Sequence, residues 1–348
     1  MAVSNRTQPR MEDIAERLRV SITTVRRAFL KNEGIQPGTL VRKSRQIMFS
    51  ILFLTVIFIS GGCNEQLKMN TAGGNPDIIE LPVHFYRMYP INYQAKYPSD
   101  AMLGWGSDTI NLDINKTALI VMHTWNLGLD DKLPWPPKER CLEKQMQSTE
   151  WVKRYRKDVK QIEEILNFAR KHNMNICHIA GLEHYAEDYP AYRQNKAQAG
   201  PEPVRPEGAF HGTTWHEDWL NRIYGQGFYK QMKELHRRLD FASNVRPASG
   251  EGVCVTSHQL NHWLRKRGIN NLIYTGFAIN MCLWFSPCGM SDMMRYNYRS
   301  LCIEECVTTV EYKETAYELR NKESAMWRVS LMFGYVLKKD EFMSAVMR

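Results

Sequence analysis

Cys282 is the residue of this chain whose setting most suggests chemistry. It follows an apolar, β-prone run at residues 272–275 and Gly276, and it stands where a helix is expected to begin. A buried strand, a sharp turn and a helix start present the nucleophile of many α/β enzymes at the carboxyl edge of a parallel sheet. The field of a helix N-terminus also favours thiolate over thiol. The alternative is a buried core cysteine, the commoner state of a free thiol.

The elements that must position Cys282 alternate between strands and helices from residue 117 onward. Buried strands are expected at residues 117–122, 174–180, 252–255, 271–275 and 300–305. Helices are expected from a cap at residue 148 or 149 to residue 172, and at 227–239, 259–266 and 314–332, with a long loop at 181–225. This alternation implies right-handed crossovers and a mainly parallel sheet covered by helices on both faces.

The string from Gly276 to Leu283 resembles the signature of the isochorismatase-like cysteine hydrolases, Gly-x-Ala-Thr-x-x-Cys-Val. The segments 117–123, 258–276 and 333–346 resemble the same family, so the resemblance covers about residues 116–346. It implies an α/β fold with a Rossmann-like, doubly wound sheet, a homo-oligomer, and hydrolysis of a small amide-type substrate. It also implies a cis peptide at Phe277–Ala278, in a turn whose backbone at Phe277, Ala278 and Cys282 forms an oxyanion hole.

Two usual partners of the family's nucleophile are missing from this sequence. His123 stands where the family has an aspartate, and Arg246 is the nearest candidate for the usual lysine. An arginine can hold charge but cannot shuttle protons, whereas a histidine can act as a base at neutral pH. Two interpretations therefore remain open. The chain is either a rewired hydrolase that uses Cys282 and His123, or a domain that kept the fold and lost catalysis.

Histidines and tryptophans near the expected carboxyl edge are candidates for the substrate pocket. They are Trp125, His184, His211 and Trp284. Ordinary core aromatics and surface histidines are the alternative for each residue taken singly. Nicotinamidase-like relatives bind a metal in this region through an Asp-x-His pair, but Leu182 occupies the aspartate position here. We therefore predict neither a metal site nor a cofactor.

The net charge of +9 is concentrated near the N-terminus, where residues 1–46 contain ten Lys/Arg and four Asp/Glu. Residues 10–30 are typical of two short helices joined by a turn. They resemble the helix-turn-helix of lactose-repressor-type regulators, which implies that Ile22, Thr23 and Arg27 face the major groove of DNA. A basic helical pair without a DNA role is the alternative. Nucleic acid is thus a partner only if residues 1–45 are expressed.

Residues 41–63 resemble a bacterial lipoprotein signal, with a basic start, an apolar run at 47–59 and small residues before Cys63. The run is shorter than the roughly 20 residues of a membrane span. The resemblance implies lipidation at Cys63, membrane attachment and an extracytoplasmic domain in the bacterial cell envelope. Because a secretory signal begins a chain, we expect translation to start near Val41, with the upstream residues a gene-model extension.

The sequence therefore divides into four predicted parts. These are a helix-turn-helix-like segment at 1–45, a hydrophobic signal at 46–63, a tether and irregular lead-in at 64–115, and a hydrolase domain at 116–348. The eight cysteines include no CxxC pair and indicate no disulfide framework. The leading hypothesis is a lipid-anchored cysteine hydrolase. The alternative is a membrane-tethered DNA-binding regulator with a catalytically inactive sensor domain.

Overall fold

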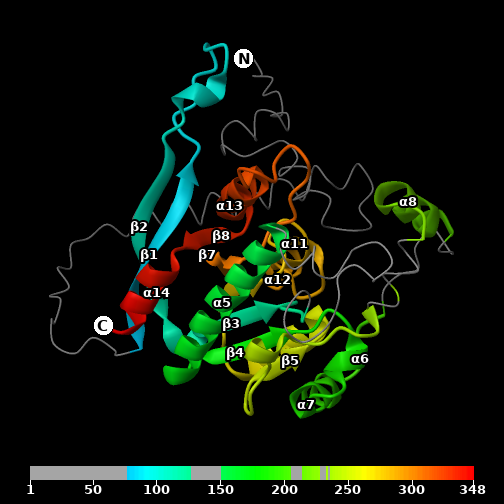
Figure 1. The fold of residues 1–348 in the computed structure, drawn as a ribbon. Helices are drawn as coiled ribbons and strands as arrows, with labels where there is room; N and C mark the ends of the chain where they lie inside the picture. The colour runs from blue at the N-terminus through cyan, green and yellow to red at the C-terminus, as the bar shows by residue number, and fades with distance from the viewer. Residues whose placement is uncertain (1–76, 127–149, 205–213, 228–232, 234–235) are drawn as a thin grey trace, which may run out of the picture. The chain divides into compact units, whose positions relative to one another are not determined.

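A computed structural model describes residues 77–126, 150–204, 214–227, 233 and 236–348. They contain an eight-stranded sheet with the order β2-β1-β8-β7-β6-β3-β4-β5 (Figure 1). The strands are β1 Ile78–Arg87, β2 Gly104–Asp113, β3 Thr117–Met122, β4 Asn175–Ile179, β5 Gly252–Cys254, β6 Asn271–Gly276, β7 Arg299–Val307 and β8 Gly334–Leu337. Strands β3 to β8 pair in parallel, whereas β1 pairs antiparallel with β2 and β8. The predicted mainly parallel sheet is confirmed.

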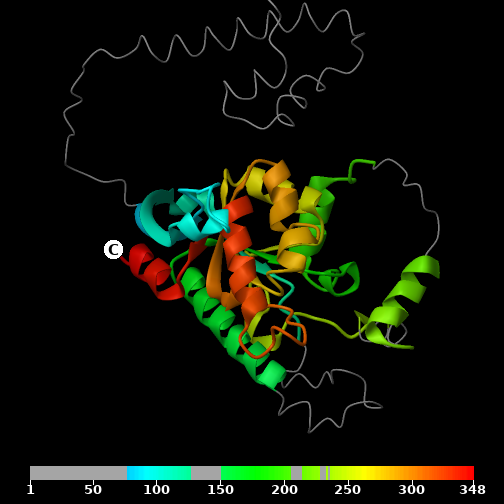
Figure 2. The same ribbon diagram turned by 90° about the horizontal axis from the view of Figure 1, so that it is seen from above.

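Helices cover both faces of this sheet (Figure 2). Every residue of β3 is buried, as expected for a parallel strand with a core on each side. Leu119 and Val121 belong to the core beneath α5 (Glu150–Lys171) and α14 (Lys339–Val346). The alternate residues of β3 belong to a second core beneath α10 (Ser257–Lys266), α12 (Met290–Arg295) and α13 (Arg320–Met332). The two faces therefore follow from side-chain alternation along each strand.

The strand order fixes where a ligand site is expected. The parallel strands lie in the order β5-β4-β3-β6-β7-β8, so the chain winds outward in one direction from β3 and in the other from β6. A crevice forms outside the carboxyl ends of two strands at such a switch point, and ligands of open α/β sheets bind there. The residues that directly follow β3 and β6 therefore face this position.

Residues 78–113 differ from the expected irregular lead-in, because they form a hairpin that extends the sheet. β1 and β2 pair from Ile78 opposite Asp113 to Arg87 opposite Gly104. Leu81 and Val83 of β1 are fully buried, and the strand lies against β8. The prolines of this segment indicated loop in the sequence, but the buried alternate positions of β1 stabilise a strand that accommodates Pro82.

The prediction of a long loop at 181–225 is also wrong, since the described part of this segment contains three helices. They are α6 (Glu183–Ala186), α7 (Pro190–Ala199) and α8 (Thr214–Tyr224). Pro190 lies in the first turn of α7, where its missing N–H leaves no hydrogen bond unmade. A residue that suggested a loop thus begins a helix. The helix expected at 227–239 falls largely outside the described residues.

The N-terminal predictions fall on residues that the structure does not describe. These include Ile22, Thr23 and Arg27 of the helix-turn-helix-like segment, the apolar run at 47–59 and Cys63. Within the described ranges, none of the helices combines the length and apolar character that crossing a membrane requires.

Candidate active site

The turn after β6 depends on a close approach between two strands. Gly276 has a φ of +117°, and a Cβ atom built on it would lie 1.9 Å from the carbonyl oxygen of Met122, the last residue of β3. The next residue, Phe277, donates its backbone N–H to the same carbonyl at 3.0 Å. Only glycine has both the backbone freedom and the lack of a side chain that this contact requires.

The turn from Phe277 to Cys282 leaves three backbone N–H groups without an acceptor among the described residues, namely those of Ala278, Asn280 and Cys282. The Phe277–Ala278 peptide is cis, as the resemblance implied. The carbonyl of Ala278 accepts hydrogen bonds from the N–H groups of Met281 and Leu283, both at 3.1 Å. By contrast, the N–H groups of Ala278 and Cys282 donate no hydrogen bond within the described part of the chain. Both are available to a negatively charged oxygen beside the cysteine.

Cys282 is the first residue of α11 (Cys282–Phe285), a single helical turn. Ser286 ends the helix in an extended conformation, because the residue before Pro287 is disfavoured in the helical region. A helix this short contributes only a small dipole field. Access is what distinguishes Cys282, which is partly exposed, whereas the other five described cysteines are buried. It is therefore the described thiol best placed to react.

His123 follows β3 as a buried and uncharged side chain. Its backbone is left-handed at φ 51°, and the residue is 5% exposed. Its ring stacks on Trp125, with centroids 5.1 Å apart and planes at 13°. Burial lowers the pKa of His123 to about 4, so the imidazole is neutral at pH 7. Nδ1 has no partner among the described residues, and no hydrogen bond there joins His123 to Cys282.

Two tyrosines that the sequence analysis did not identify hold Trp125 in place. Tyr185 accepts a hydrogen bond from the indole Nε1 of Trp125 at 3.0 Å, and Tyr155 donates to the Trp125 carbonyl at 2.7 Å. The ring of Tyr155 also packs on Phe277, with centroids 4.4 Å apart. Tyr155 therefore links the segment after β3 to the turn after β6. No motif marks it, because it reads as one apolar position of an amphipathic helix.

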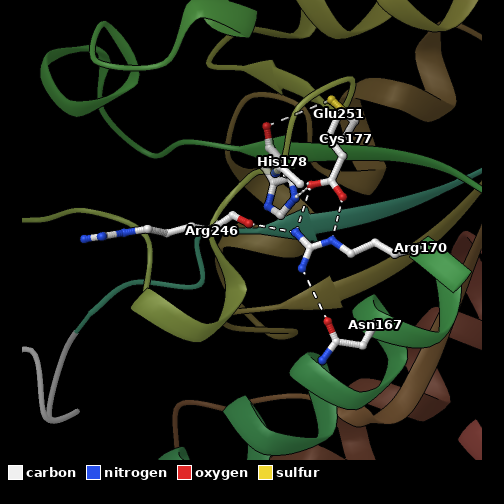
Figure 3. Close-up of polar contacts among 7 residues, drawn as sticks. Asn167, Arg170, Cys177, His178, Arg246 and Glu251 are labelled. Atoms are coloured by element: carbon white, nitrogen blue, oxygen red, sulfur yellow. Dashed lines mark hydrogen bonds and ion pairs between the residues drawn. The ribbon is translucent and has the colours of Figure 1, made fainter.

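Arg246 lies before the edge strand β5. It was predicted to stand in for the lysine that works with the nucleophile, but its side chain pairs with Asp240. Its guanidinium forms an ion pair with Asp240 at 2.8 Å, and its side chain is half exposed. Figure 3 shows this side chain extending away from the buried polar cluster beside it. Among the described residues it forms no hydrogen bond or ion pair with Cys282 or His123. No hydrogen bond or ion pair among the described residues therefore joins the three residues that were predicted to act as a unit.

The cluster beside Arg246 is a triad of a fully buried His178, a nearly buried Glu251 side chain and a partly exposed Arg170 (Figure 3). The Glu251 carboxylate accepts hydrogen bonds from His178 Nε2 at 2.8 Å and from Arg170 Nε at 2.7 Å. Burial raises the pKa of Glu251, but the hydrogen bonds from His178, Arg170 and the Ala248 backbone outweigh it and lower that pKa to about 2. Burial lowers the pKa of His178 despite the carboxylate. The triad thus contains an ionised Glu251 and a neutral His178.

The structure describes two of the three remaining predicted pocket residues, His184 and Trp284. His184 is exposed on α6 next to Tyr185. Trp284 is 4% exposed and packs against Phe333 in the second core, on the other face of the sheet from Trp125. His211 lies outside the described residues. Within the described ranges, no group of three or more His, Cys, Asp or Glu side chains is arranged to hold a metal ion.

Comparisons with known proteins found similarity only among solved structures. No protein-family model and no curated protein matches the chain. A cysteine hydrolase from Pseudomonas syringae is 11% identical, with a TM-score of 0.41, and the match covers 68% of this chain and 94% of that one. An isochorismatase family protein from Desulfovibrio vulgaris is 15% identical, with a TM-score of 0.37 and coverage of 67% and 99%. An N-carbamoylsarcosine amidase from Thermoplasma acidophilum is 15% identical, with a TM-score of 0.35 and coverage of 65% and 97%.

Proposed function

We propose that residues 116–348 form a cysteine hydrolase of the isochorismatase-like class, which acts on a small amide-type substrate. One observation carries this proposal. A partly exposed Cys282 follows the strand at the switch point of the sheet, in a turn whose Ala278 and Cys282 N–H groups donate to no described residue. A nucleophile beside unused N–H donors is the arrangement that acyl transfer requires.

In the proposed reaction His123 takes the proton of the Cys282 thiol, and the resulting thiolate attacks the substrate carbonyl carbon. A C–S bond forms, and the π electron pair moves to the oxygen, which the N–H groups of Ala278 and Cys282 stabilise. Collapse of this intermediate breaks the C–N bond, and the leaving amine takes a proton from His123. Water then attacks the thioester and gives a proton to His123. Collapse of this second intermediate breaks the C–S bond and releases the carboxylic acid, and His123 returns its proton to the Cys282 thiolate.

His123 suits a proton shuttle because it is neutral before the reaction begins. Its burial penalises the imidazolium, which keeps the proton-free form available at pH 7. When Cys282 gives up its proton, the negative charge of the thiolate favours the imidazolium and offsets part of this penalty. Nδ1 of His123 makes no hydrogen bond in the described structure, so no protein group there competes with a reacting group for this ring nitrogen.

Replacement of the nucleophile tests the proposed function. The purified full chain is assayed against a panel of small amides that includes nicotinamide and N-carbamoylsarcosine, the latter after the name of a structurally similar amidase. Cys282→Ala should reduce turnover by at least about 1,000-fold while the melting temperature stays within a few degrees. Cys302→Ala, which removes a fully buried thiol from β7, should keep its activity. Undiminished turnover by Cys282→Ala would remove the proposal.

A catalytically inactive sensor domain is the second candidate. It is favoured by the absence of a hydrogen bond between Cys282 and His123 in the described structure and by the pairing of Arg246 with Asp240. In that case the chain would be a membrane-tethered regulator whose residues 1–45 bind DNA. No amide of the panel would be hydrolysed, and the full chain in detergent would retard an operator-like duplex in a gel-shift assay.

We further propose that the mature protein is lipid-anchored at Cys63 in the bacterial cell envelope and forms homo-oligomers. This location follows from the lipoprotein-like signal at 41–63. Metabolic labelling with radioactive palmitate should mark the wild-type chain and not Cys63→Ala. Labelling would also argue against the regulator, because the processing that exposes Cys63 removes the DNA-binding head.

A further inference from the structure

The segment after β7 is joined to the nucleophile turn on both sides of Thr309. On the near side, the Thr308 N–H donates to the Gly276 carbonyl at 3.1 Å, and the Thr308 carbonyl accepts from Ile279 at 2.9 Å. On the far side the Asn280 side chain makes two reciprocal bonds, from Nδ2 to the Val310 carbonyl at 2.8 Å and from the Val310 N–H to Oδ1 at 3.0 Å. Thr309 is therefore held against the turn that carries Cys282.

The outer side of this segment is fixed as well. The first turn of α13 has no side-chain cap from its own N-cap residue, Leu319. Instead, the Glu311 carboxylate accepts hydrogen bonds from the N–H groups of Asn321 at 3.2 Å and Lys322 at 3.1 Å. Asn321 also donates its side-chain amide to the Val310 carbonyl at 3.0 Å. The position of Thr309 is thus set by the turn on one side and by α13 on the other.

The Thr309 hydroxyl has no partner in this environment. Its Oγ1 is buried and makes no hydrogen bond within the described part of the structure. Buried hydroxyls in folded proteins almost always have a protein, water or ligand partner. The N–H groups of Ala278 and Cys282, in the adjoining turn, likewise donate no hydrogen bond to a described residue. Two segments that are hydrogen-bonded to each other therefore both carry polar groups without a described partner, and one of these segments contains Cys282.

We infer that Thr309 is a substrate-binding residue whose hydroxyl accepts a hydrogen bond from the amide N–H of the molecule bound at Cys282. This inference rests on the proposed function and narrows its substrate class. The Ala278 and Cys282 N–H groups match the carbonyl oxygen of an amide, and the hydroxyl is an uncharged acceptor for the neighbouring N–H. The preferred substrates are primary or secondary amides, because esters and tertiary amides of the same acid lack this hydrogen.

The test compares an amide with its ester in variants of the full chain. Thr309→Val keeps the side-chain shape and should lower kcat/KM for the best primary amide of the panel by about 10- to 100-fold. The methyl ester of the same acid should be affected less than about threefold, so the amide-to-ester ratio falls. Thr309→Ser should restore most of the amide activity. Ser300→Ala removes another buried, unpartnered hydroxyl at the other end of β7 and should change neither rate.

A second readout does not depend on turnover. Iodoacetamide and methyl iodoacetate alkylate a thiolate by the same displacement of iodide, but only iodoacetamide carries the N–H. The ratio of their rates at Cys282, followed by peptide mass spectrometry, should fall in Thr309→Val and recover in Thr309→Ser. A lowered ratio in a chain that hydrolyses no amide would uphold the contact while removing the hydrolase. An unchanged ratio, or equal losses for both reagents with a lower melting temperature, would overturn the inference.

Discussion

His123 can serve as the proposed base because its surroundings keep it uncharged. The stacked Trp125 and the end of β3 exclude water from its ring, and burial is the cause of its lowered pKa. A histidine in solution would be half protonated near pH 6.5, whereas this side chain keeps its proton acceptor free well below that pH. The same burial that orients the ring therefore widens the pH range in which it can act.

The decrease of kcat/KM at acid pH should reflect the lowered pKa of His123. A base must be unprotonated to act, so kcat/KM should remain level as pH falls through 6.5 and should decrease only near pH 4, the pKa of His123. Steady-state rates with the best amide of the panel, measured from pH 4 to 8 under conditions where the chain stays folded, give the profile. A decrease centred near pH 6.5 would contradict the assigned environment of His123.

For single residues, the sequence predicted the positions that depend on neighbouring residues in the chain and missed the contacts that depend on the tertiary structure. The position of Cys282 follows from neighbouring residues, namely a buried strand, Gly276 and a helix start. The ion pair of Arg246 with Asp240 and the burial of Trp284 depend on segments that fold beside them. Thr309 carries no sequence signal, since its importance lies in an unpartnered hydroxyl beside a turn thirty residues earlier.

At the scale of elements, the contact between the carboxyl ends of β3 and β6 decides where Cys282 is presented. The two strands pair in register up to Met122 opposite Gly276. The chain of β6 then turns over the Met122 carbonyl, which leaves no room for a side chain. The turn that carries Cys282 is thus a consequence of strand pairing as much as of its own residues.

Gly276→Ala should therefore damage both stability and activity. The added methyl would overlap the Met122 carbonyl and strain a backbone of positive φ, so we expect a loss of roughly 2–4 kcal/mol in the free energy of unfolding. Gly268→Ala is the matched control, because Gly268 also has a positive φ but no atom within 4 Å of the added Cβ. Urea denaturation of both variants separates overlap from backbone strain. Equal losses would show that the close approach does not matter.

The elements predicted correctly are those with a strong periodic signal. Residues 117–122 were predicted as a strand and form β3. Their nearly continuous apolar run is recognisable without knowledge of the strands that pair with it, and all six residues are buried. The hairpin of β1 and β2 was missed, since its strands are stabilised by each other and by β8, more than 220 residues later. Pro190 was read as a loop residue because the sequence does not show that it begins α7, where proline is tolerated.

At the scale of the whole molecule, the His178–Glu251–Arg170 triad ties three parts of the fold together. Arg170 belongs to α5, His178 to β4, and Glu251 to the segment that leads into β5. Arg170 also donates to the Arg246 carbonyl at 2.7 Å, which fixes the backbone before the edge strand. β5 has only three residues, so these buried polar contacts help to hold it in the sheet.

Glu251→Gln should reveal this link through acid stability. The folded pKa of about 2 lies below the ordinary 4.5, so between these values the unfolded chain binds a proton that the folded chain does not. The wild type should therefore lose stability as pH falls from 4.5 toward 2, and the variant should lack this part of the slope. At pH 7 the variant should be less stable by roughly 2–4 kcal/mol, because Arg170 loses its buried partner.

Denaturation curves at several pH values provide the measurement, with Glu187→Gln as the control. Glu187 pairs with Lys196 at 2.8 Å on the surface, where an ion pair contributes little. The control should keep the acid slope of the wild type. If both variants kept that slope, Glu251 would not be ionised in the folded protein as the triad requires.

Acylation of the full chain by p-nitrophenyl acetate tests the central claim most directly. This activated ester transfers its acetyl group to a reactive thiolate and releases p-nitrophenol, so the modified residue identifies the nucleophile. We expect a burst of p-nitrophenol and an acetyl group on the Cys282 peptide, both lost in Cys282→Ala and retained in Cys302→Ala. Acetylation spread over other residues, or a burst that survives in Cys282→Ala, would contradict the claim.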